Sequence, residues 1–333
     1  MKKRLFIFCL FILTFNSYSQ IFKNSNGEGV FFTEKAKQLS VETEFSKKTS
    51  SASLQLNSPL KSIKYYKLNS KDSIFTVQTS YSILTQLDLV NTQSITKGLE
   101  NPEVSFKLGI IKTIDSLNTS EFVKPAISWG ASTKITYNNK KVLYDTINKV
   151  KSTKYPYSFS LDLNAEIYPK RVNFLAIGIV AGYKNTNNYD DLDSFQDLPL
   201  DYSDNNISSI KDSEDGKIGD FKTLNNYYIG VSTPFFPFKF KNSSNLFGKV
   251  VERVAIVPYY RNTFGDSNIS NWGASFSFVD IGLRNESFSA LFNSGFSLGL
   301  DWVRKKGKTT SNVFIGGKFS IDGIIKDLTK LPE

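Results

Sequence analysis

The chain has 333 residues, with 41 Lys and Arg against 31 Asp and Glu, one Cys, one Met and no His. Cys9 and the initiator Met1 both lie at the N-terminus, so loss of that segment would leave a chain without Cys, Met or His. These absences exclude histidine-based acid–base catalysis, thiol chemistry, disulfides, and zinc or copper sites built from His and Cys. Aromatic residues make up 14% of the chain, yet all hydrophobic residues make up only 40%.

Residues 1–19 have the pattern of a secretory signal peptide. Three bases precede nine apolar residues at 5–13, and Ser17 and Ser19 put small side chains at the −3 and −1 positions of a cleavage site. The apolar run is too short to cross a bilayer, which needs about 20 residues. Cleavage leaves 38 bases and 31 acids, a net charge of +7, and a short lead at residues 20–38 that we expect to be periplasmic or tucked into the lumen of the fold.

Weak strand candidates open the mature chain. Residues 39–46 and 51–57 read as a hairpin over a turn at 47–50, and further candidates follow at 63–68 and 74–84. These runs alternate apolar and polar residues only in part, so their strand pattern is weaker than that of the segments that come after them.

The middle of the chain contains the clearest strand patterns. Residues 104–110 and 127–137 alternate with period two, and 142–148 is a shorter candidate. From Tyr157 to Ile167 the alternation is complete, with every odd position apolar and every even position polar. Such a pattern indicates a strand with one apolar and one polar face.

A long acidic segment, residues 185–225, follows the strand candidate at 175–183. Residues 190–220 hold ten acids and two Lys, a net charge of −8, which leaves +15 on the rest of the mature chain. Because it lacks strand alternation, we expect a long extracellular loop. It is a solvated acidic rim, a constriction folded back on the basic body, or a binding site for divalent cations.

The cation alternative rests on three carboxylates of this segment. Asp212, Glu214 and Asp215 offer the hard oxygen ligands that Ca²⁺ takes, although their spacing does not match an EF-hand loop. We therefore predict no cofactor other than, at most, Ca²⁺ at this loop.

Strand candidates resume after the acidic segment and run to a short tail at 322–333. In the candidate at 272–283 the parity slips near Val279, where a β-bulge would restore it. Counted along the whole chain, the candidates predict about 12 strands, within a range of 10–14. The candidates of this last part are 227–236, 254–260, 272–283, 296–302 and 313–319.

Strand length distinguishes a membrane barrel from a sandwich. Strands of soluble proteins usually have about 5–6 residues, whereas a membrane-spanning strand needs about 9–11. The cleanest patterns, at 127–137 and 157–167, have eleven residues, or about 25 Å of vertical height at a 45° tilt. The predicted fold class is therefore all-β, a transmembrane antiparallel β-barrel over residues 39–321. A soluble secreted β-sandwich is the alternative.

Aromatic residues near strand ends support the barrel. Amphipathic rings prefer the level of the lipid headgroups, so they form girdles at the ends of membrane-spanning strands. The predicted lipid-interface residues are Tyr137, Tyr157, Tyr183, Tyr260, Trp272 and Trp302.

By this pattern the chain resembles the outer-membrane β-barrel proteins of bacteria with two membranes, in a porin-like form. Many members end on an aromatic residue, whereas this chain ends at Glu333; Phe319 would then be the aromatic of the last strand, with a tail after it. The barrel enzymes of that membrane resemble one another in needing a catalytic His, so we expect no enzymatic activity. Asp162 and Glu166 lie about 13 Å apart along one strand, too far apart for a glycosidase pair.

The polar faces define candidate lumen residues of both signs. If the barrel is narrow, these charges pair across the lumen, and if it is wide, they tune a passive pore for small solutes or ions, with mild anion preference. The alternative is a non-conducting scaffold for adhesion or secretion. Expected partners are outer-membrane lipid and small solutes or another protein, but not nucleic acid; a periplasmic or secreted location is the alternative. The lumen candidates are Lys107, Lys134, Asp162, Glu166, Arg253, Arg261, Asp301 and Lys318.

Overall fold

The structure is a computed structural model, and every structural statement below concerns the residues that it describes. These residues are 38–46, 50–68, 74–91, 103–116, 126–138, 141–145, 150–168, 175–194, 217–237, 254–278 and 295–320. The predicted signal peptide, nearly all of the lead, the centre of the acidic segment and the tail lie outside them.

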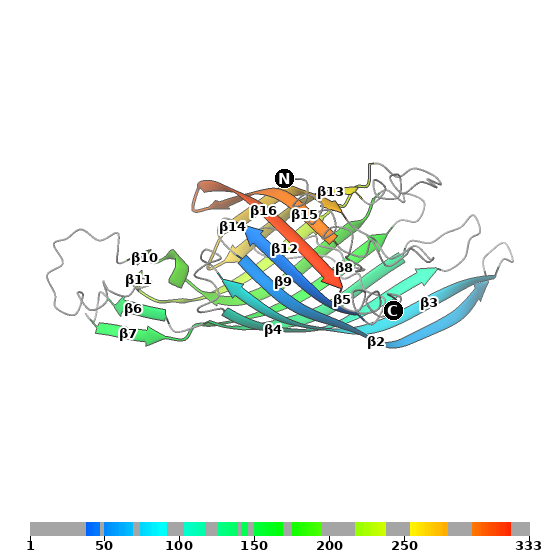
Figure 1. Cartoon of the computed structure of the whole chain (residues 1–333), viewed down its shortest axis with the longest axis horizontal. Helices are drawn as coiled ribbons and strands as arrows, with labels where there is room; N and C mark the ends of the chain where they lie inside the picture. Colours follow the sequence, from blue (N-terminus) through cyan, green and yellow to red (C-terminus); the bar gives the residue numbers. More distant parts are fainter. Residues whose placement is uncertain are drawn as a thin grey trace, which may run out of the picture.

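Within these ranges the chain is almost entirely β (Figure 1), and its one helix is a single 3₁₀ turn, η1 (Tyr189–Asp191). No described helix has the length and apolar character needed to cross a membrane. The strands are β1 (Gln38–Ser46), β2 (Ser50–Leu68), β3 (Ile74–Asn91), β4 (Glu103–Ser116), β5 (Ala126–Tyr137), β6 (Lys141–Asp145), β7 (Val150–Lys154), β8 (Tyr157–Tyr168), β9 (Ile177–Asn187), β10 (Asp193–Ser194), β11 (Lys217–Ile218), β12 (Thr223–Ser232), β13 (Val254–Gly265), β14 (Ile269–Phe278), β15 (Gly295–Lys305) and β16 (Lys308–Ser320).

Twelve strands form one closed antiparallel barrel, in the order β1-β16-β15-β14-β13-β12-β9-β8-β5-β4-β3-β2. The first strand closes it, because β1 pairs with β2 on one side and with β16 on the other. The predicted barrel of about 12 strands is therefore confirmed, and a two-sheet sandwich is excluded for the described chain. The hairpin predicted over 47–50 is present as β1 and β2.

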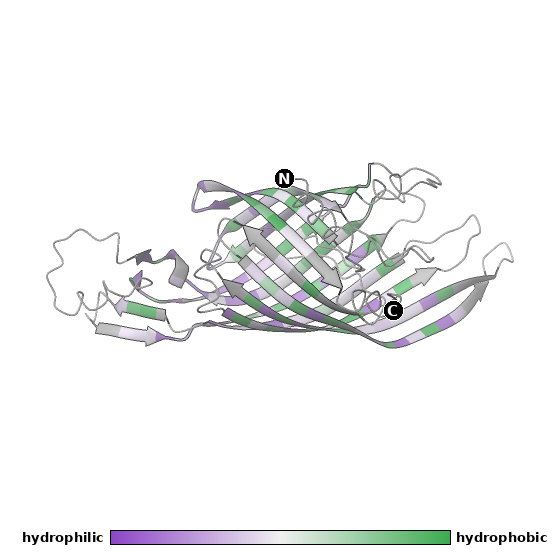
Figure 2. Ribbon diagram, viewed as in Figure 1, coloured by the Kyte–Doolittle hydropathy of each residue, from purple (hydrophilic) through white to green (hydrophobic). Residues whose placement is uncertain are grey.

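The barrel has an apolar outside and a polar inside, the reverse of a soluble protein. Figure 2 shows hydrophobic residues recurring along the strands of the barrel. Leu163 and Ile135 on the outer face are 55% and 56% exposed, whereas Asn164 and Ser132 on the inner face are 6% and 2% exposed. Since large exposed apolar surfaces mark a lipid or protein contact, this inversion is what a barrel in lipid requires.

Three inward-facing rings fill the space above inward-facing glycines. Tyr228 lies opposite Gly182, Tyr259 opposite Gly273, and Phe314 opposite Gly299. In each pair a Cβ on the glycine would overlap the ring, so the missing side chain lets the ring lie along the wall. These three glycines thus allow the rings to approach the backbone of the neighbouring strand closely. Glycines at such positions are common in curved sheets.

The two ends of the barrel differ. At one end, which we call the termini end, β1 begins and β16 ends. The β2–β3 hairpin extends past the start of β1 at this end. At the small-sheet end, the connections between β5 and β8 and between β9 and β12 build a separate sheet with the order β10-β11-β6-β7. Figure 1 shows the small sheet projecting to the left and the β2–β3 hairpin to the right.

The small sheet corrects two predictions. The candidate at 142–148 is not a barrel strand, because it forms β6 of the small sheet, where Leu143 and Tyr144 are each 2% exposed. The segment 185–225 is not one unbroken loop, because β9, η1, β10, β11 and β12 all include part of it. Asn188 holds its two ends together: its amide donates to the carbonyl of Asp220 at 2.8 Å and its carbonyl accepts from the backbone N–H of Lys222 at 2.7 Å.

Strand boundaries differ from the prediction mainly in β2 and β3. The separate candidates 51–57 and 63–68 are one strand, β2, whose register shifts between Pro59 and Lys61. A proline cannot donate to the ladder, which explains why the alternation is broken there. β14 is described to Phe278, so the bulge predicted near Val279 lies outside the described residues.

Candidate functional site: the lumen wall

Two ion pairs cross the part of the wall made by β3, β4, β5 and β8. The Nζ of Lys134 lies 2.6 Å from Oδ2 of Asp88, and the Nζ of Lys107 lies 3.7 Å from Oδ2 of Asp162. The side chain of Asp88 is 7% exposed, whereas those of Lys107, Lys134 and Asp162 are 20%, 31% and 18% exposed. Asp88 is therefore the group that most needs its partner, since buried charges are stable only when paired.

Two further acids are fully enclosed in the wall. Glu166 on β8 and Asp301 on β15 are both 0% exposed. The amide of Asn312 on β16 donates to Oδ1 of Asp301 at 3.0 Å, and Asn312 is the register partner of Asp301. Glu166 has a partner as well. The wall thus holds its acids in contacts rather than leaving them free.

A cation lies over an aromatic ring on the opposite part of the wall. The guanidinium of Arg261 on β13 lies 3.8 Å from the centre of the Tyr228 ring on β12. The ring in turn covers Gly182 of β9. This stack fixes the arginine on the inner face, and a cation over a ring gains further from electrostatic attraction.

Next to Arg261 the wall carries an amide without protein partners. Asn271 on β14 is the register partner of Arg261. It is 3% exposed, and neither atom of its amide has a hydrogen-bond partner. Because a buried amide costs free energy unless it is bonded, this part of the lumen has the polarity to hold water or a polar solute.

The charges of the described wall are nearly balanced. At inward positions whose side chains the structure describes, the terminal residues of strands aside, there are four acids and five bases. The acids are Asp88, Asp162, Glu166 and Asp301, and the bases are Lys64, Lys107, Lys134, Lys184 and Arg261. Lys64 lies on the part of the β2–β3 hairpin that extends past the start of β1. The anion preference stays a prediction.

Of the predicted lumen residues, two cannot be placed. Arg253 lies outside the described residues, and Lys318 lies in β16 opposite Glu42, but its side chain is not described. Asp88 was missed because the candidate strand 74–84 ended too early. Continuing its alternation through Gln86 to Asp88 would have found it, since Leu87 and Leu89 face outward.

The carboxylates of the proposed Ca²⁺ loop, Asp212, Glu214 and Asp215, also lie outside the described residues, and calcium binding stays a prediction. In the described part of the chain, no group of three or more His, Cys, Asp and Glu could hold a metal ion. Titration calorimetry with Ca²⁺ that shows no heat above buffer would remove the idea.

The predicted interface aromatics all lie on outward positions, each in the half of its strand nearer the small-sheet end. Tyr137 pairs with Tyr157, and Trp272 pairs with both Tyr260 and Trp302. Tyr183 pairs with Tyr227, and their ring centres are 5.4 Å apart. These groups lie on the outer surface, and their contact with lipid headgroups stays a prediction.

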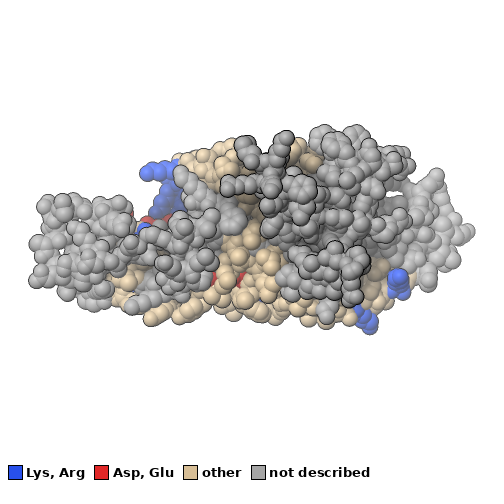
Figure 3. Space-filling view, viewed as in Figure 1, with Lys and Arg blue, Asp and Glu red and all other residues tan. Residues whose placement is uncertain are grey.

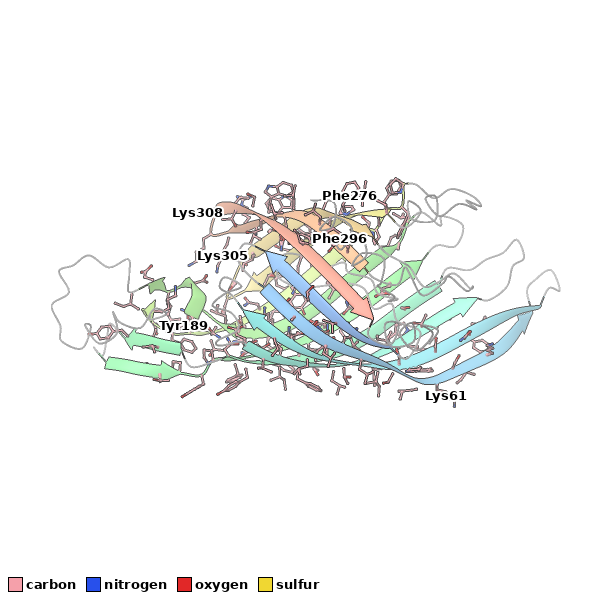
Figure 4. The ribbon with its side chains drawn as sticks, viewed as in Figure 1. Lys61, Tyr189, Phe276, Phe296, Lys305 and Lys308 are labelled. Atoms are coloured by element: carbon pink, nitrogen blue, oxygen red, sulfur yellow. The ribbon has the colours of Figure 1, made fainter. Side chains whose placement is uncertain are left out.

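An ion pair links two connections at this end of the barrel. Lys305, at the end of β15, contacts Asp191 of η1, and Figure 4 shows Lys305 and Lys308 at the turn between β15 and β16. The hydroxyl of Tyr189 donates to the carbonyl of Val142 at 2.9 Å, so η1 is tied to the small sheet as well.

Comparison with known proteins gives distant structural likenesses only. No protein-family model and no curated protein sequence matches the chain. It is similar to the KdgM porin, solved in complex with disordered oligogalacturonate, at 8% identity over 85% of this chain and 99% of that one, with a TM-score of 0.34. The NanC porin is 9% identical over 84% of this chain and 98% of that one, with a TM-score of 0.32. An outer membrane channel from Pseudomonas putida F1 is 9% identical over 88% of this chain and 99% of that one, with a TM-score of 0.34. The barrel assignment itself rests on the strand pairing.

Proposed function

We propose that the protein is an outer-membrane β-barrel that acts as a narrow passive pore for small polar solutes or ions. The observation that carries this proposal is the inversion of polarity in a closed barrel: apolar outside, polar inside. β5 and β8 have 12 residues each. At about 3.3 Å per residue and a tilt of about 45°, this length gives roughly 28 Å of height, enough to cross a bilayer core.

The nearly balanced wall supports weak charge selectivity. Each lysine of these two ion pairs lies beside a carboxylate, so a passing ion meets neutralised pairs rather than a ring of one sign. The inward position of these pairs makes them the groups whose removal changes selectivity most.

Single-channel recording in planar bilayers tests this function. Lys107→Gln removes one inward positive charge and leaves Asp162 without that partner, so the reversal potential in a salt gradient should shift toward cations. Lys61→Gln is the matched control, because it removes the same charge from an exposed lysine of β2, outside the lumen. The pore proposal fails if folded wild-type protein in the bilayer produces no conductance steps.

A second candidate function is a non-conducting scaffold, and one observation favours it. Inward groups such as Ser105, Ser297, Glu166 and Phe314 are at most 1% exposed, so the described interior leaves little room for water. A folded barrel without conductance steps, together with a stable partner recovered by affinity purification, would support the scaffold instead.

Membrane insertion is tested separately from conduction. Dependence on detergent for solubility, and slower migration on a gel after boiling, would support a membrane barrel over a secreted soluble protein. We place the small-sheet end outside the cell, because long connections of such barrels face outward.

A further inference from the structure

Charged residues are rare on the outer face of the barrel strands. At outward positions whose side chains the structure describes, the residues that are charged at neutral pH are Lys61 on β2, Lys112 on β4 and Arg304 on β15. All three are cations. Arg304 lies at the small-sheet end, whereas Lys61 and Lys112 lie together toward the termini end.

The two lysines belong to one row of four residues that crosses four neighbouring strands. Lys61 pairs with Tyr81, Tyr81 with Lys112, and Lys112 with Trp129. Residues directly opposite each other in neighbouring strands share a face of the sheet. Cations and rings therefore alternate along the row on the outer surface. We call these four residues the Lys–aromatic row.

Lys112 is held between the two rings of the row. Its Nζ lies 5.5 Å from the centre of the Tyr81 ring and 5.4 Å from the centre of the Trp129 ring. Ile110 on the same strand is 58% exposed, and Trp129 is 50% exposed, so the lysine emerges from an apolar surface. Cation–π contacts orient an ammonium group but leave its charge in place. The positive charge of Lys112 therefore remains able to attract an anion.

The position of Lys61 adds a second cation within reach. Lys61 is exposed and, in Figure 4, its side chain lies away from the ribbon at the lower right. Figure 3 shows blue atoms at this corner of the molecule. Two strand spacings of about 4.8 Å separate the backbones of Lys61 and Lys112. Since a lysine side chain extends several ångströms, both ammonium groups can reach one phosphate.

We propose that the Lys–aromatic row binds the phosphate of an anionic glycerophospholipid. This inference rests on the proposed membrane location. Rings beside cations at the edge of an apolar band match the level of lipid headgroups, and basic residues there attract anionic lipids. With the small-sheet end outside, the row lies toward the inner leaflet of the outer membrane, which consists of glycerophospholipids.

Native mass spectrometry of the full chain in detergent tests the site, with phosphatidylglycerol as the probe. Removal of one lysine lowers affinity about fivefold, and the double variant Lys61→Gln/Lys112→Gln lowers it roughly thirtyfold. Arg304→Gln is the matched control, because it removes an outward cation at the other end and should leave this binding unchanged. Lys61→Arg/Lys112→Arg keeps both charges and should retain binding, which separates loss of charge from loss of fold.

The results that overturn the lipid site differ from those that overturn the proposed function. The site is overturned if the double variant retains phosphatidylglycerol as well as the wild type does. It is also overturned if the wild type binds phosphatidylcholine as well as phosphatidylglycerol. Displacement of the lipid by inorganic phosphate alone would make it a free-phosphate site and overturn the lipid assignment. If the wild type does not insert into any bilayer, the proposed function fails; if it inserts and the double variant binds lipid normally, this inference alone fails.

Discussion

Leu163→Arg tests whether the outer face of the barrel lies in hydrocarbon. Leu163 is near the middle of β8 and is 55% exposed. Leu163 lies six positions after Tyr157, the first residue of β8, and at about 3.3 Å per residue and a tilt near 45° this is roughly 14 Å of height. An apolar band about 25 Å tall therefore has Leu163 near its midplane.

The expected cost of Leu163→Arg is about 2–4 kcal/mol of unfolding free energy, the usual penalty for arginine on the lipid face at the midplane. Tyr157→Arg is the matched control. Tyr157 lies on the same strand and face and is 66% exposed, but it is at the strand end, where the same change costs only about 0–1 kcal/mol. The difference between the two variants measures depth in the membrane rather than the effect of a charge.

Reversible unfolding in urea, with the protein folded into phospholipid vesicles and followed by tryptophan fluorescence, gives both free energies. A soluble barrel would lose little from either change, because both side chains would point into water. Equal costs for the two variants, or no cost for Leu163→Arg, would refute the placement of this face in lipid.

Three further changes test the interior and the small-sheet end. Lys134→Met removes the ion pair between Lys134 and the carboxylate of Asp88 and should lower the unfolding free energy by about 1–3 kcal/mol; adding Asp88→Asn should recover most of it. Gly299→Ala forces its Cβ onto the Phe314 ring and should cost about 1–3 kcal/mol, and the cost should disappear in a Phe314→Ala background. Lys305→Gln breaks an ion pair whose side chains are 35% and 36% exposed, so urea titration should show a change of less than about 1 kcal/mol.

Local alternation was enough to predict most of the barrel strands. From Tyr157 to Ile167 the two faces differ completely in polarity, and the structure has β8 over Tyr157–Tyr168. A strand of period two must turn one face to an apolar medium, so the residues themselves carry this information. The inward direction of Lys107 and Arg261 followed from the same parity.

The partners of these residues could not be predicted, because pairing depends on register between strands that are distant in the chain. Asp88 and Lys134 are 46 positions apart in the sequence, yet they form an ion pair of 2.6 Å. Alternation does not predict the small sheet. Its segments are held by the side-chain amide of Asn188 and by buried residues of β6, and these contacts join parts of the chain that are distant in sequence.

By itself, the sequence determined the strand-rich fold, the approximate strand number and the polarity of each face, since these follow from residue order at period two. The tertiary structure decided which strands close the barrel, which charges neutralise one another, and that acids and bases are nearly balanced on the described wall. It also brought Lys61, Tyr81, Lys112 and Trp129 into one row. Their spacing along the chain shows nothing of this, because strand register alone puts them side by side.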